Sequence, residues 1–196
     1  DWTKKKLNRC FSPTTITEAD KDGNFKVLLR SDLVGTIIPI IFIAKGYMPQ
    51  VRFISLEKKE HYRIEQTQLR RMENPEFAII AGIAFDEEPN FDLRICNIKL
   101  LENVVINVVG KENTYRTRTD KEGFYVLSIP EGEYAITFGR ENSFFDNKGG
   151  FLPLEESFTY QSGTEKYNMK EQDKGKSNLH KGETVIVNYK VSEMAW

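Results

Sequence analysis

The sequence has few of the residues that nucleophilic and metal-dependent enzymes commonly use. It contains two histidines, His61 and His180, and two cysteines, Cys10 and Cys96, and their spacing matches no metal or redox motif such as CxxC. It also contains no GxSxG sequence and no glycine-rich phosphate loop. We therefore predict a protein that is not an enzyme and has no catalytic residues, metal site or cofactor. We interpret both histidines as exposed surface residues.

The sequence also lacks long apolar runs and an excess of either charge. Its most apolar stretch, residues 36–44, is of strand length and contains Pro39, whereas a membrane-spanning helix needs about 20 apolar residues. The 28 Lys and Arg residues balance the 29 Asp and Glu residues, so no overall field attracts nucleic acid. We expect no transmembrane segment and no nucleic-acid partner. Because the chain begins at Asp1 rather than Met, we expect that a signal peptide, an upstream domain or a proteolysed segment preceded it.

The two cysteines leave two interpretations open. Cys10 and Cys96 are either unpaired residues that act as small apolar side chains or partners in a disulfide between the two halves of the chain.

The sequence is rich in residues that favour strands and turns, with 13 Gly, 7 Pro, 13 Phe and 8 Tyr. The segment TRTDKEGFYVL (residues 117–127) predicts a hairpin, because residues 120–123 have the aspartate and glycine that a tight turn favours. The same pattern occurs 100 residues earlier, at residues 15–28, with its turn at residues 20–23. We interpret the two hairpins as parts of a tandem repeat.

Further alternating segments predict strands around these hairpins. Tyr134, Ile136 and Phe138 share one face of a predicted strand. The remaining predicted strands are residues 38–45 and 60–72 in the first half and residues 76–85, 103–110 and 182–191 in the second.

Two tandem antiparallel β-sandwich domains account for this order of elements. The boundary is predicted near residues 73–75, because Pro75 ends a preceding strand. The domains are then residues 1–74 and 75–196. The first domain lacks an opening strand, so we expect that either a missing upstream segment or another protein chain supplies it, the latter by strand addition at an open sheet edge.

The second domain contains a long predicted insertion at residues 139–181, which is polar but carries six aromatic residues. Loops of this length are commonly functional or disordered. The aromatic residues either pack back onto the sandwich or form a contact surface for a partner protein. The candidate contact residues are Phe144, Phe145, Phe151, Tyr160 and Tyr167.

The second half resembles a known family of domains. Its motifs, in order, are AGIAFD (81–86), VVINV (104–108), TDxxGFY (119–125), IPxGxY (129–134) and GETV (182–185). This order resembles the carboxypeptidase regulatory-like domain of the transthyretin-like (prealbumin-like) β-sandwiches, and the first half looks like the same module with its front missing. The resemblance implies Ig-like sandwiches that serve as structural or protein-binding modules of secreted, periplasmic or cell-surface proteins.

Three other functions are compatible with sandwiches of this kind. Intradiol dioxygenases share the hairpin motif but hold iron through two tyrosines and two histidines, and residues 134–140 contain no histidine. A carbohydrate-binding module is a stronger alternative, although Trp2 and Trp196 lie at the extreme ends. Lys–Asn isopeptide repeats need a lysine in the first strand, which residues 77–85 lack, so we interpret Asn188 as an outward-facing strand residue.

Calcium binding by the acidic residues of the first turn is the remaining alternative. Asp20 and Asp22 resemble the start of a calcium loop, but the rest of the ligand series is absent. We interpret them as turn residues.

Overall fold

The computed structural model describes residues 17–27, 37–57, 64, 66–90, 95–140, 157–160 and 176–191. These residues form an all-β structure of twelve strands and contain no helix. The strands are β1 (Ile37–Phe42), β2 (Gln50–Ser55), β3 (Ala78–Asn90), β4 (Ile95–Leu100), β5 (Val104–Val109), β6 (Thr114–Arg118), β7 (Phe124–Ile129), β8 (Gly132–Arg140), β9 (Ser157–Tyr160), β10 (Lys176–Leu179), β11 (Thr184–Val187) and β12 (Tyr189–Val191).

The long strand β3 organises one sheet. It pairs antiparallel with β7 and then with β4 along one edge, and parallel with β11 and then β12 along the other. β9 extends this sheet by pairing antiparallel with β11. The β3 sequence is apolar over residues 78–85, as expected for a strand buried in the middle of a sheet.

A second, antiparallel sheet has the strand order β10-β8-β5-β6. It faces the β3 sheet across the main core, which contains alternate residues of both sheets. The predicted face of β8 is confirmed, because Tyr134, Ile136 and Phe138 all lie in this core. Phe138 stacks on Tyr189 with ring centroids 4.8 Å apart, which joins β8 to β12 across the core.

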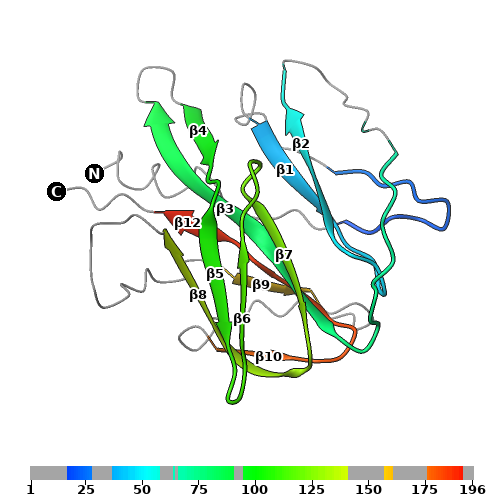
Figure 1. The fold of residues 1–196 in the computed structure, drawn as a ribbon. Coiled ribbons are helices and arrows are strands. Elements are labelled where there is room, and N and C mark those ends of the chain that lie inside the picture. The colour runs from blue at the N-terminus through cyan, green and yellow to red at the C-terminus, as the bar shows by residue number, and fades with distance from the viewer. Residues whose placement is uncertain are drawn as a thin grey trace, which may run out of the picture.

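Strands β1 and β2 of the first half form a two-stranded antiparallel sheet (Figure 1). Figure 1 shows this pair on the opposite side of β3 from β8. Ile41, Ile43 and Met48 pack there against a second cluster of buried residues that includes Ile79 and Ile186. The β3 sheet is therefore covered on both faces, which explains why residues 78–85 are buried without alternation.

The predicted turns are confirmed, but the hairpin at residues 117–127 is not. The Gly123 N–H donates to the Asp120 carbonyl at 2.9 Å, which closes the turn. However, β6 before the turn pairs with β5, whereas β7 after it pairs with β3. The chain therefore crosses from one sheet to the other at this turn.

The predicted closing strand of the first half, residues 60–72, is also not formed in the described part of that segment. Residues 64 and 66–72 contain a single bridge, between Arg71 and Tyr47. The prediction failed because an alternating sequence produces a strand only where a partner edge accepts its backbone hydrogen bonds.

The predicted insertion at residues 139–181 contains two strands, β9 and β10. β9 pairs with β11 and β10 pairs with β8, so each strand extends one of the two facing sheets. The interpretation of the whole segment as a loop was wrong. Its polar composition is typical of loops, but two stretches of four residues form strands. The arrangement as separate sandwiches at residues 1–74 and 75–196 stays a prediction.

Among the described residues, no helix is long and apolar enough to cross a membrane.

Candidate functional site

Most of the aromatic residues expected to contact a partner lie outside the described residues. This applies to Phe144, Phe145, Phe151 and Tyr167. Tyr160 is the last residue of β9, where its backbone lies opposite Thr184 of β11. The contact surface at these aromatic residues therefore stays a prediction.

The proposed disulfide also stays a prediction. Cys10 lies outside the described residues, and so does the side chain of Cys96. The backbone of Cys96 belongs to β4, opposite Pro89 of β3.

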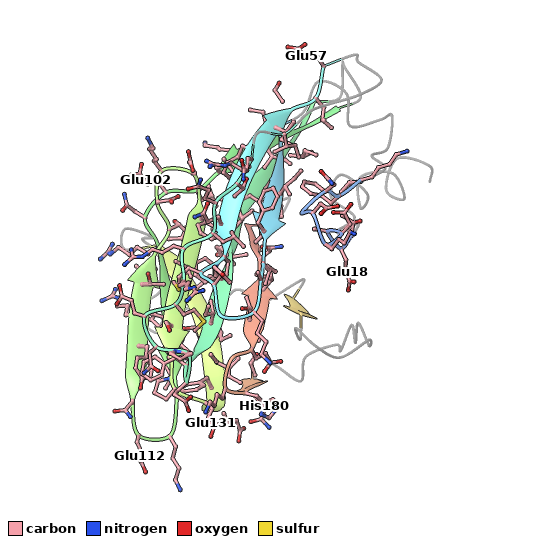
Figure 2. All side chains as sticks on the ribbon, turned by 90° about the vertical axis from the view of Figure 1, so that its right-hand side faces the viewer. Glu18, Glu57, Glu102, Glu112, Glu131 and His180 are labelled. Carbon is pink, nitrogen blue, oxygen red and sulfur yellow. The ribbon has the colours of Figure 1, made fainter. Side chains whose placement is uncertain are left out.

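The side chains with catalytic chemistry do not converge in the described part of the chain. His61 lies outside it, and His180 is exposed, as expected. Figure 2 shows Glu57 at one end of the molecule and Glu112 at the other, with Glu18 and Glu102 at separate points between them. No three His, Cys, Asp or Glu residues among those described come together in a way that could hold a metal ion.

Several buried polar groups have structural partners. The Tyr125 hydroxyl donates to the Val187 carbonyl at 2.6 Å, and burial raises the pKa of this tyrosine well above its ordinary value. The Thr119 hydroxyl accepts from the Val104 N–H at 3.0 Å and donates to the Leu101 carbonyl at 2.6 Å. Both side chains join segments that are distant in sequence, a role that requires no ligand.

Asn188 is not the outward-facing strand residue that we expected. It is half-buried between β11 and β12, and its side-chain oxygen accepts from the Ile83 N–H of β3 at 3.0 Å. The amide replaces a backbone acceptor at the break between β11 and β12.

The most distinctive feature of the first half is the pair of edges of the β1–β2 sheet. Its register is continuous and places Pro39 opposite Phe53. Proline has no N–H, so a continuous ladder requires this to be a non-hydrogen-bonded pair. The nitrogen of Pro39 therefore points away from β2, toward the outer edge of β1, where the missing donor interrupts the row of backbone groups.

The same register defines the other edge. Because hydrogen-bonded and non-hydrogen-bonded pairs alternate, Gln50, Arg52 and Ile54 bond to β1. The backbone groups of Val51, Phe53 and Ser55 then point outward. No described strand other than β1 pairs with β2, and this outer row contains no proline. We call these three residues the β2 edge.

Both faces of the β1–β2 sheet carry apolar side chains. Ile41, on one face, packs toward the β3 sheet. Ile38, on the other face, is also buried, and Phe42 on that face meets the ring of Phe25 edge-on with centroids 5.6 Å apart. A strand added at the β2 edge would continue both faces, so it could bury apolar side chains on either side.

The sequence predicted an open edge in the first half but missed β2 itself. The segment QVRFIS contains the β-branched and aromatic residues typical of strands. Pro39 in the middle of the preceding strand was the signal for an edge. Together they could have located the two strands of this sheet, although the register is needed to choose between its edges.

Comparison with known proteins found no matching family model, no matching curated protein and no matching solved structure.

Proposed function

We propose that this chain is a non-catalytic, protein-binding module of a secreted, periplasmic or cell-surface protein. In this proposal residues 1–74 and 75–196 are two transthyretin-like sandwich modules of the carboxypeptidase regulatory-like type. The order of the sequence motifs supports the family, and so does the two-layer core between β8 and β3. The proposed activity is recognition of another protein chain.

The β2 edge is the observation that carries this proposal. Val51, Phe53 and Ser55 direct three N–H and three C=O groups outward from a strand that pairs only with β1 in the described chain. Such a row binds an extended segment of a partner by adding it as the next strand. A two-stranded sheet is marginally stable alone, so a third strand would also stabilise the first half.

The aromatic residues of the second half form a second proposed contact. Phe144, Phe145, Phe151, Tyr160 and Tyr167 supply large apolar surface, which protein interfaces favour. We assign them the role of anchors for the same partner.

Amide hydrogen exchange tests strand addition. In the free protein we expect Val51, Phe53 and Ser55 to exchange faster than Gln50, Arg52 and Ile54, because only the second group bonds to β1. A capped peptide of alternating Val and Thr should then slow exchange at the first group. A peptide methylated at every backbone nitrogen is the control and should give no protection, because neither of its edges can donate hydrogen bonds.

Substitution at Ser55 provides a matched pair of variants. Ser55→Pro removes an outward N–H without removing a bond to β1, whereas Ser55→Ala keeps that N–H. We expect the proline variant to stay folded and lose about two- to tenfold in peptide affinity, since an edge hydrogen bond contributes about 0.5–1.5 kcal/mol. Equal affinity for both variants, or slow exchange at all six amides without peptide, would exclude this edge as the binding site.

A further inference from the structure

An exposed arginine, Arg52, lies near the middle of β2. Arg52 lies opposite Ile40 of β1 and on the sheet face opposite to that of Val51 and Phe53. None of the described residues makes an ion pair or hydrogen bond with its side chain. The neighbours of Arg52 on its face of the sheet are Ile40, directly opposite on β1, and Ile54, two residues further along β2. Neither side chain carries a charge opposite to that of the arginine.

An arginine in this place selects among incoming strands. Side chains directly opposite each other on neighbouring strands have Cβ atoms about 4.5–5.5 Å apart, so their charges interact. A lysine or arginine opposite Arg52 is unfavourable, which also disfavours a second copy of β2 in the register that pairs Arg52 with itself. An aspartate or glutamate opposite Arg52 is favourable and can accept two of its N–H groups.

The positions of an added strand on either side of the one opposite Arg52 face the other side of the sheet, where the surroundings favour apolar residues. Residues of an added strand that lie opposite Val51 and Phe53 point toward the face on which Ile41 packs against the β3 sheet. Both Val51 and Phe53 are half-buried, so apolar side chains beside them would cover the part of their surface that is still exposed. Specificity therefore alternates along the strand, apolar on one face and acidic on the other.

We propose that the partner of the β2 edge is an extended protein segment with an acidic residue opposite Arg52, flanked on both sides by apolar residues opposite Val51 and Phe53. This inference rests on the proposed strand addition and specifies the chemistry of the added strand. The partner is recognised by its backbone, by two apolar side chains and by one carboxylate.

Three capped peptides that differ only in the central residue test the inference. Each has valine on both sides of Glu, Gln or Lys, and each is titrated into the wild-type protein and into Arg52→Glu. We expect the wild type to bind the Glu peptide about two- to fivefold more tightly than the Gln peptide, the range of a cross-strand charge pair. Arg52→Glu should reverse this order and prefer the Lys peptide. Both preferences should shrink as the salt concentration rises.

The outcomes separate this inference from the function on which it rests. If the Gln peptide slows exchange at Val51, Phe53 and Ser55 but all three peptides bind both proteins equally, strand addition holds and the acidic partner is wrong. If no peptide protects these amides, both proposals fail. Sedimentation of the free protein tests the remaining occupant: a concentration-dependent dimer that protects the same amides would replace the acidic partner with a second copy. Arg52→Gln, which should bind all three peptides with similar affinity, controls for effects of the reversed charge on folding.

Discussion

Two turns 100 residues apart share the same set of hydrogen bonds from backbone N–H groups. In the first, the Gly23 N–H donates to the Asp20 carbonyl at 2.9 Å, and the Asp20 side chain accepts from the N–H groups at positions 22 and 24. In the second, the Gly123 N–H donates to the Asp120 carbonyl at 2.9 Å, and the Asp120 side chain accepts from positions 122 and 124. Both glycines have positive φ, 82° and 68°.

The surroundings of the two turns differ completely. A Cβ atom built on Gly23 would meet no atom within 4 Å, whereas one on Gly123 would lie 2.6 Å from the Ala84 carbonyl oxygen. The residue before each aspartate differs as well. Ala19 is exposed, but Thr119 is buried and bonds through its side chain to both Val104 and Leu101.

This comparison separates what a short sequence determines from what the tertiary structure adds. The aspartate and the glycine produce the turn in both places, because their hydrogen bonds and backbone angles are local. Only the second turn is built into two sheets. Its residues should therefore contribute far more to the stability of the whole protein.

Substitution of the two glycines should give the largest difference. Alanine at position 23 adds only the strain of a positive φ, about 1–2 kcal/mol. Alanine at position 123 adds that strain and a collision with the Ala84 backbone, for a total of about 2–5 kcal/mol. Urea unfolding of Gly23→Ala and Gly123→Ala measures both values. Equal losses would show that the second turn is no more tightly packed than the first.

The same contrast explains how much of the fold could be predicted. The two turns were correctly located from residues 20–23 and 120–123, since turn chemistry is contained in a few neighbouring residues. The core face of Tyr134, Ile136 and Phe138 was also correct because alternation is local. The sheet to which each strand belongs was not predicted correctly. Whether β6 and β7 share a sheet depends on their pairing with strands that lie elsewhere in the sequence.

The candidate site was harder to predict than the fold. The sequence indicated an open edge in the first half, but choosing an edge required the register that places Pro39 opposite Phe53. Arg52 belongs to no recognisable sequence motif. Its proposed role comes from its central position in β2, which pairs with β1 and with no other strand among the described residues.

Thr119 offers a second, smaller test of the comparison. Thr119→Val keeps the shape of the side chain but leaves the Val104 N–H and the Leu101 carbonyl without their side-chain partner in a buried place. We expect a loss of about 1–3 kcal/mol in the free energy of unfolding. The matched variant Ala19→Thr, at the exposed equivalent position, should change stability by less than about 0.5 kcal/mol. A tolerated Thr119→Val would mean that the crossing between the two sheets does not depend on this hydroxyl.

The smallest expected effect is a pH dependence confined to the first turn. The Asn24 N–H, with further donors in the turn, holds the pKa of Asp20 below its ordinary value. A carboxyl group whose folded pKa is lowered stabilises the turn above its unfolded pKa, and this contribution is lost as the pH falls through the folded value. The amide signals of positions 22 and 24 should therefore stay constant down to about pH 4 and shift below it.

An NMR titration of the wild type and of Asp20→Asn measures this dependence. The asparagine variant keeps one acceptor oxygen but has no charge, so the shift at positions 22 and 24 should disappear. Because Asp20 is fully exposed, the change should leave the urea midpoint of the whole protein nearly constant. If Asp20 instead titrated above its ordinary value, the carboxylate could not be the acceptor that holds this turn. The local bonds shared by the two turns would then have different origins.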